Sequence, residues 1–359
     1  MNQKRLFKKW IGTSRYVYNR ALNAVKENGE KINFFELRNK YVTSKNNSLV
    51  SEWELETPKD IRAEAINDMT KAFKTAMSNL KNNNIEKFNL QYRSKKKESS
   101  ISIPHSAIKI NNGNMYIYKS YTKEGIKLSK DKSLINMKIE HNCRLKNDNG
   151  KWFLYIPIKA KLNKKIADKE ICSLDPGTRK FQTIYSEEMV IKIGIKKEQI
   201  KKLQQKIDLL QSLRSKKLIR KSHYNKRNNK IQYKVKNLVD ELHYQTISYL
   251  TNTFKTIFIP EFESQELLKI NKSKKFRRDL LSLRHFVFKE RLKAKSKLKE
   301  GCCVLVCTEE YTSKTCGRCG NIVNIGSNEI FTCDNCFLEI DRDVNGSRNI
   351  LIKQLNQTK

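Results

Sequence analysis

Residues 314–351 read KTCGRCGNIVNIGSNEIFTCDNCFLEIDRDVNGSRNIL and contain two CxxC pairs, Cys316/Cys319 and Cys333/Cys336. Thirteen residues separate the two pairs. This spacing is typical of two tight knuckles that bring four thiolates around one tetrahedral Zn²⁺ ion. Since a site closed by four cysteines leaves no open position for a substrate, the zinc is predicted to be structural. The alternative, two redox-active pairs, lacks the usual context of a redox CxxC motif.

Acidic residues predict a second site. Asp175 ends the apolar stretch 171–174 and is followed at once by a Pro-Gly turn, whereas Asp341 and Asp343 lie beside Asn345 just after the second cysteine pair. Taken singly, the first acid is an ordinary strand-end cap and the later ones begin an ordinary capped helix. Together with an acid on an intervening strand, they can hold two Mg²⁺ ions roughly 3.5–4 Å apart and hydrolyse a phosphodiester.

The charge of the chain points to a polyanionic partner. Its 359 residues include 74 Lys and Arg against 37 acids, a formal net charge of +37. Nucleic acid is the first candidate for the partner of such a chain. A wholly disordered basic tail is excluded, because 38% of the residues are hydrophobic and 15 Phe, 14 Tyr and 3 Trp can build cores.

Membrane and secretory functions are not expected. The N-terminus, MNQKRLFKKW, is charged and has no apolar signal region, and no apolar run approaches the ~18–20 residues needed to span a bilayer. The cysteines outside the two pairs are scattered, which fits a reducing compartment. We therefore expect an intracellular protein without a membrane partner, in the cytoplasm, the nucleus or a viral factory, depending on the host.

Hydrophobic periodicity changes along the chain. Residues 1 to about 95 predict helices, in which Trp10 and Tyr18 alternate with cations and could either stack on bases or build a core. From about residue 96, short alternating runs separated by Asn-Gly turns predict a small β-barrel or sandwich. Two apolar seams at about 195–250 predict two long antiparallel helices joined by a basic tip.

Three segments carry a resemblance to a known family. LDPGTRKFQTIYS, TEEYTSKTCGRCG and DRDVNGSRNIL, in this order around the four cysteines, resemble the TnpB/OrfB proteins of insertion sequences and their eukaryotic and viral relatives called Fanzor. The resemblance extends upstream to TPKDIRAEAINDMTKAF, YRSKKK and RRDLLSLRHFVFKERLKAKSK, and so covers nearly the whole chain. Such proteins look like small ancestors of type V CRISPR effectors.

The resemblance implies an α+β multidomain fold. It implies a helical recognition lobe, a β-barrel wedge domain and a RuvC-like α/β nuclease domain of the RNase H fold, interrupted by a four-Cys zinc ribbon. The expected boundaries are 1–95 for the helical lobe, 96–165 for the wedge domain, 166–315 for the nuclease domain with its helical hairpin, 316–336 for the ribbon and 337–359 for the last RuvC-like segment.

The resemblance also implies the catalytic acids. Asp175 matches the first RuvC-like acid and Asp343 the last. Many relatives carry the middle Glu where this chain has Pro260, but a Fanzor-like subgroup uses a relocated Glu in a segment resembling 308–312. Glu309 is therefore the expected middle acid, and Glu261 and Glu263 are its reserves. These acids would bind Mg²⁺.

The implied activity is an RNA-guided, Mg²⁺-dependent DNA endonuclease of a mobile element. Its partners would be a non-coding guide RNA, double-stranded DNA with a short flanking motif, and a separate transposase or recombinase of the same element. Base pairing would read the sequence while the protein reads duplex shape and the flanking motif. Four cations near the site are expected to contact backbone phosphates: Lys314, Arg318, Arg342 and Arg348.

One departure supports an alternative. Relatives begin with a β-strand and a basic turn before the helix that resembles Lys9–Arg15, whereas this chain starts almost at that helix. We therefore expect the N-terminal wedge strand to be missing. The alternative function is a truncated or nuclease-inactive DNA- or RNA-binding protein of a mobile element. A zinc-ribbon nucleic-acid scaffold unrelated to cutting is a third possibility, but it leaves the acids of DPGTR and DRDVN without a role.

Overall fold

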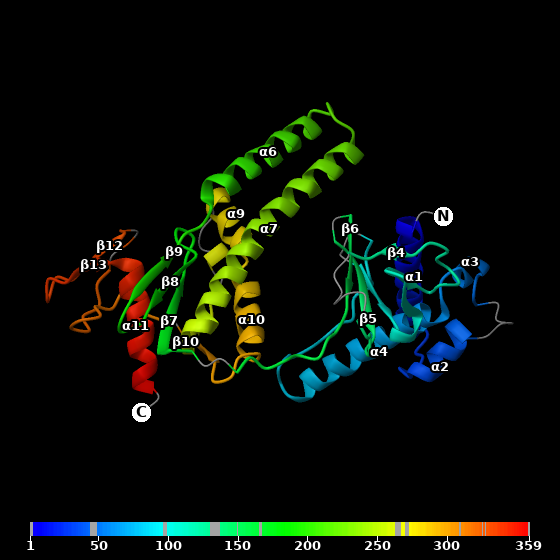
Figure 1. The fold of residues 1–359 in the computed structure, drawn as a ribbon, viewed down its shortest axis with the longest axis horizontal. Helices are drawn as coiled ribbons and strands as arrows, with labels where there is room; N and C mark the ends of the chain where they lie inside the picture. The colour runs from blue at the N-terminus through cyan, green and yellow to red at the C-terminus, as the bar shows by residue number, and fades with distance from the viewer. Residues whose placement is uncertain are drawn as a thin grey trace. The chain divides into compact units, whose positions relative to one another are not determined.

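Two structural units follow one another in the chain, Met1–Lys159 and Ala160–Lys359 (Figure 1). The computed structural model describes residues 3–43, 49–95, 99–129, 137–148, 150–164, 167–262, 267–269, 273–308, 310–324, 326 and 328–357. None of the helices in these ranges has the length and apolar character that crossing a membrane requires.

The first unit begins with helices. They are α1 (Gln3–Glu27), α2 (Phe34–Arg38), the π-helix η1 (Asn39–Thr43), α3 (Glu52–Leu55) and α4 (Lys59–Lys81). The aromatic residues of α1 mostly face the core, because Trp10 is fully buried and Tyr18 is 5% exposed. Tyr16 is 42% exposed and packs edge-on against the Trp53 ring. Most of the α1 aromatics therefore build the core rather than a base-stacking surface.

Two small antiparallel sheets share the core of this unit. One sheet is ordered β1-β5-β6 and the other β2-β3-β4. Their bounds are β1 (Ser99–Ile103), β2 (Ile108–Asn111), β3 (Asn114–Ile117), β4 (Ile126–Lys127), β5 (Cys143–Asp148) and β6 (Lys151–Tyr155), with the 3₁₀ helix η2 (His105–Ala107) before β2. Asn112 and Gly113 both have positive φ between β2 and β3, the conformation that a two-residue hairpin turn requires. Closure of these sheets into a barrel remains a prediction.

The second unit is built on a five-stranded sheet ordered β11-β10-β7-β8-β9. The strands are β7 (Lys169–Pro176), β8 (Gln182–Tyr185), β9 (Val190–Ile193), β10 (Phe254–Pro260) and β11 (Cys303–Cys307). Strand β10 is parallel to both β7 and β11, whereas β8 and β9 are antiparallel to their neighbours. The sheet is therefore mixed. The parallel strands β7, β10 and β11 therefore end at one edge of the sheet.

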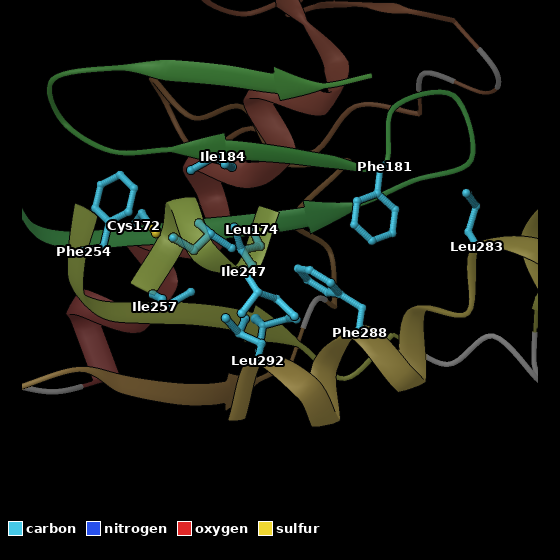
Figure 2. Packing of buried hydrophobic residues seen from close by; sticks show 12 residues of the cluster. Cys172, Leu174, Phe181, Ile184, Ile247, Phe254, Ile257, Leu283, Phe288 and Leu292 are labelled. Atoms are coloured by element: carbon cyan, nitrogen blue, oxygen red, sulfur yellow. The ribbon is translucent and has the colours of Figure 1, made fainter. Parts of the chain in front are cut away.

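Helices cover both faces of this sheet. The helices of this unit are α6 (Lys197–Ser215), which packs on α7, and α7 (Lys221–Thr253), α9 (Lys274–Leu283), α10 (His285–Ser296) and α11 (Arg342–Gln357). Figure 2 shows the face toward α7 and α10, where Leu174 and Ile257 pack with Ile247 and Leu292. The opposite face packs on α11, where Phe258 meets apolar residues of that helix (Figure 1).

The small ribbon lies between β11 and α11 in the sequence. Its two short strands, β12 (Ile330–Thr332) and β13 (Glu339–Asp341), pair antiparallel, and Phe331 is fully buried beside the cysteines. The second unit is thus an α/β sheet with a four-cysteine insertion, as the α+β nuclease prediction requires.

Two histidines stack on one phenylalanine in the core of this unit. The Phe181 ring lies 5.1 Å from the His243 ring and 5.3 Å from the His285 ring, both nearly parallel to it. His243 Nε2 donates to Leu283 O at 2.9 Å, so its Nδ1 can accept from Arg291. Burial lowers the pKa of both histidines to about 4. Both rings are therefore neutral parts of the core at neutral pH.

These histidines predict acid sensitivity. Above pH 6.5 they are neutral in both the folded and the unfolded chain and add nothing to the pH dependence. Below pH 6.5 the unfolded chain binds the protons first, so the free energy of unfolding should fall until about pH 4, by on the order of 3 kcal/mol for each histidine. We expect His285→Leu to reduce this slope, measured by denaturant unfolding from pH 8 to 4. An unchanged slope would contradict the assignment.

Candidate active site and metal centre

Asp175 lies at the end of the central strand β7, on the face covered by α11. Alternation along the strand points Leu174 into the opposite core, so Ser173 and Asp175 share the α11 face. The contacts agree: Ser173 Oγ donates to the Ser347 carbonyl of α11 at 2.6 Å. A Cβ on Gly346 would lie 2.8 Å from Asp175 Oδ2. The half-buried carboxylate therefore touches the backbone of α11.

Asp343 lies in the first turn of the same helix. It precedes Gly346 by three residues, which places both on one face of α11. The neighbouring Asp341 has another role, because its Oδ1 accepts hydrogen bonds from the backbone N–H groups of Asp343 and Val344, at 3.0 and 3.2 Å. Asp341 thus caps the helix, while Asp343 and Asp175 come to the same edge of the sheet.

The pKa of Asp341 fits a capping carboxylate. Burial raises the pKa, but a hydrogen bond from Lys192 Nζ at 2.6 Å and the two capping N–H groups outweigh it, so the pKa is lowered. Asp341 is therefore held ionised at the positive end of the helix dipole.

The middle acid is not defined by the described residues. Glu309 and Glu263 lie outside them. Glu261 is described, and it follows β10 with a side chain that is 70% exposed and paired with Lys289 Nζ of α10 at 3.2 Å. It therefore lies on the α10 side, whereas Asp175 faces α11. No third carboxylate within the described ranges lies close enough to Asp175 and Asp343 to share an ion with them.

The four cysteines meet as the spacing predicts. The Sγ atoms of Cys316, Cys319, Cys333 and Cys336 lie within 4.8 Å of one another, with Cys316–Cys336 at 3.5 Å and Cys319–Cys333 at 3.6 Å. Four thiolates on a tetrahedral Zn²⁺ with bonds of about 2.3 Å would be about 3.8 Å apart. The cluster has the size and the donor set of a zinc site.

Thiol ionisation shows why a cation fits this cluster. A hydrogen bond from the Asn321 backbone lowers the pKa of Cys319 to about 6, whereas desolvation raises the pKa of Cys336 to about 12. The negative charge of the thiolates that form first therefore repels a further negative charge and opposes ionisation of the last thiol. A divalent cation removes this repulsion, since metal binding requires and stabilises the thiolates.

Two asparagines of α11 hold the first cysteine knuckle. Asn345 Nδ2 donates to Thr315 O at 2.8 Å and its Oδ1 accepts from Gly317 N at 3.1 Å. Asn349 Nδ2 donates to Thr315 O at 2.7 Å and to Thr312 O at 2.8 Å. Asn345 was expected beside the acids, whereas no role was predicted for Asn349. Their spacing of four residues, which places both on one face of a helix, was the available signal.

The four expected phosphate-binding cations differ in their surroundings. Lys314 and Arg318 are both exposed on the first knuckle. Arg342 donates to Gly326 O of the ribbon at 2.8 Å, and Arg348 is half-buried, with its Cδ 3.4 Å from where a Cβ on Gly317 would lie. Lys314 and Arg318 are therefore the more accessible of the four.

A cavity of about 480 Å³ adjoins the turn after Asp175. It is lined by Thr178 of that turn and by residues of α6 and α9. Five of its lining residues are cations and three are acids, and Arg278 pairs with Asp208 through two hydrogen bonds of 2.8 Å. Its other cations are Lys197, Lys201, Lys274 and Lys275. The cavity therefore has more cations than acids and lies close to the end of β7 that carries Asp175.

Two sequence families match parts of the chain. The Cas12f1-like TNB domain matches residues 285–350, which run from α10 through β11 and the ribbon into α11. The helix-turn-helix domain of the OrfB IS605 type matches residues 1–31, which contain α1. The first match thus spans both the cysteine cluster and Asp343.

Similar proteins extend the match over most of the chain. A protein of Paramecium bursaria Chlorella virus 1 named as a transposase is 29% identical over 99% of this chain and 84% of its own length. A TnpB-like protein of Acanthamoeba polyphaga mimivirus is 29% identical over 81% of this chain, which spans 56% of that protein.

A solved structure shares the fold. Cas12f1, in a complex with sgRNA and target DNA, superposes with a TM-score of 0.53 at 15% identity, over 98% of this chain and 82% of that one. The motifs around the cysteine cluster, the similar proteins and the shared fold agree. The chain is therefore similar to the TnpB/OrfB proteins over nearly its whole length.

Proposed function

We propose that this protein is an RNA-guided DNA endonuclease that cleaves phosphodiesters with Mg²⁺ at a RuvC-like site. The observation that carries the proposal is the contact between Asp175 and the backbone of α11 at Gly346, one turn from Asp343. Two acids from distant parts of the chain thereby come to the carboxyl edge of the sheet. The family and the fold shared with Cas12f1 support the same conclusion.

Asp175 and Asp343 would hold Mg²⁺, because hard carboxylate oxygens are its preferred ligands. When bound, Mg²⁺ supplies an activated water and stabilises the leaving 3′ oxygen. The protein's own contribution is to fix the two carboxylates. The cap that Asp341 provides fixes the first turn of α11, and the contact with Gly346 fixes Asp175.

Glu309 is the proposed middle acid. In β11, Cys307 packs in the core under α11, on the face that Asp175 shares. Glu309 follows the end of β11 by two residues in the sequence, and β11 ends at the same edge of the sheet as β7. Glu261, the reserve candidate, instead pairs with Lys289 of α10, on the face of the sheet opposite α11, which favours Glu309 as the middle acid. A relocated glutamate is the mark of the Fanzor-like subgroup, to which we assign the chain.

The proposed partners are a non-coding guide RNA and a double-stranded target with a short flanking motif. The named complex of Cas12f1 contains an sgRNA and target DNA, and the net charge of +37 suits two nucleic acids. The cationic cavity beside Thr178 and the accessible Lys314 and Arg318 would lie along the backbone of a bound strand. We propose a transposase or recombinase of the same element as a further partner.

Substitution of the acids tests the catalytic assignment. We expect Asp175→Ala, Asp343→Ala and Glu309→Ala each to lower guided DNA cleavage by about 10³-fold or more, since each removes a ligand that stabilises the transition state. RNA affinity, measured by gel shift, should not change. Glu261→Ala should retain cleavage.

The opposite pattern for the two glutamates, loss with Glu261→Ala and full cleavage with Glu309→Ala, would overturn the choice of middle acid. A protein that binds its native RNA but leaves a matched target intact at every Mg²⁺ concentration would refute the nuclease. It would then be a nucleic-acid-binding protein without cleavage activity.

Zinc in the cysteine cluster has its own test. The purified protein should contain about one zinc ion per chain, and Cys333→Ser should lose it, because three thiolates and a hydroxyl bind Zn²⁺ far more weakly. Acidification should release the metal, since protons compete for the thiolates. Elemental analysis and a colorimetric zinc assay from pH 8 to 5 measure both effects. Cys143→Ser, in the first unit, is the matched control.

The close approach of Gly346 predicts a graded effect of side-chain size. Gly346→Ala must displace the Asp175 carboxylate slightly, whereas Gly346→Val must displace it or the helix by more, because even a Cβ at this position would lie 2.8 Å from Oδ2. A misplacement of about 1 Å can cost about 10²-fold in rate. Cleavage should therefore fall from Gly to Ala to Val while zinc content stays constant. Equal rates for the three proteins would contradict the contact.

A further inference from the structure

The asparagine contacts link the cysteine cluster to the helix of Asp343. Asn345 hydrogen-bonds the residues on both sides of Cys316: it donates to Thr315 O at 2.8 Å and accepts from Gly317 N at 3.1 Å. Asn345 is fully buried, so both polar groups of its side chain depend on these partners. The buried Asn345 side chain can therefore make both hydrogen bonds only when the backbone on either side of Cys316 holds this conformation.

Asn349 adds a second row of contacts one turn later. Its Nδ2 donates to Thr315 O at 2.7 Å and to Thr312 O at 2.8 Å, and the residue is 7% exposed. Thr315 O thus accepts from both asparagines. We call Asn345 and Asn349 the amide clamp.

Gly317 allows the clamp to close. A Cβ at this position would lie 2.9 Å from Asn349 Oδ1 and 3.0 Å from Asn345 Oδ1, so any side chain would separate the knuckle from the helix. The described ion pairs that also join the ribbon to the sheet domain are partly exposed, with Arg179 and Glu329 at 45% and 73%. Such exposed pairs contribute little. The clamp is therefore the main buried polar link among the described residues.

We propose that the amide clamp makes the position of Asp343 depend on metal binding in the cysteine cluster. With the metal bound, Cys316 and its neighbours hold one backbone conformation, and the clamp fixes the first turn of α11 against it. Without the metal, the knuckle loses that conformation and the clamp loses its partners. The catalytic meaning of this link rests on the proposed nuclease function, whereas the link itself does not.

The division of contacts along α11 supports this dependence. Further along the helix, Ile350 and Leu351 are buried against the sheet, so the sheet holds the later turns whether or not the cluster is loaded. The first turn, which carries Asp343, is held by the Asp341 cap and by the clamp, and in the following turn the Ser347 carbonyl accepts a hydrogen bond from Ser173 of β7. Asn345 and Asn349 are therefore positioning residues.

Hydrogen exchange of the full chain tests the proposal without any cleavage assay. Amides of the first turns of α11, residues 344–349, should exchange about five to ten times more slowly in the zinc-loaded protein than after zinc removal, the factor expected of one or two hydrogen bonds. In Asn345→Ala and in Asn349→Leu, the ratio of the exchange rates without and with zinc should fall toward one. The zinc content of both variants should stay near that of the parent protein. Asn356→Ala, exposed at the far end of α11, is the control and should keep the full effect.

Each other outcome would overturn the proposal. Equal exchange with and without zinc in the parent protein would show that the sheet alone holds the first turn. Clamp variants that keep the full zinc effect would show that another contact carries it. Clamp variants that no longer retain zinc would show that the asparagines belong to the metal site rather than to a link.

Cleavage separates this inference from the proposed function. In an active nuclease, the clamp variants should require several-fold more Mg²⁺ for half-maximal cleavage, whereas Asn356→Ala should not. A protein with zinc-dependent exchange in α11 that cleaves no DNA would refute the nuclease and leave the link intact.

Discussion

Helix α11 lies against β7 so closely that a Cβ on Gly346 would lie 2.8 Å from Asp175 Oδ2. This contact sets the Asp175 carboxylate against the helix that carries Asp343. It also decides the surroundings of Asp175, whose carboxylate is covered by helix backbone on one side and remains half-buried. A larger residue at this position would displace the Asp175 carboxylate or the helix.

The same helix presents different chemistry to its two neighbours. Toward the sheet it places Ile350 and Leu351, whose burial is favourable without directional contacts. Toward the cysteine knuckle it places the amides of Asn345 and Asn349, which are favourable only when their hydrogen-bond partners stand at the right distance. The apolar side thus holds the helix in place, and the amide side makes the fit to the ribbon specific.

The sequence predicted local features better than distant ones. The cysteine cluster was predictable because CxxC spacing alone fixes which side chains meet, and Asp175 because a strand and its turn are contiguous. The partners of Asn345 and Asn349 lie about thirty residues away, and no local pattern names them. The amphipathic pattern of α1 could not decide between core and surface for Trp10. That choice depended on the sheets of the first unit, which cover the ring and bury it fully.

The order of the elements along the chain has a consequence for synthesis. Strand β7, which carries Asp175, is the first strand of its sheet to leave the ribosome, whereas α11 is the last helix in the described chain. A nascent chain can therefore begin to build the sheet before α11 is available to dock on it, because domains begin to fold during translation. The proposed acid pair is complete only when the final helix docks. The proposed nuclease activity would therefore arise late, after most of the basic residues of the chain have been made.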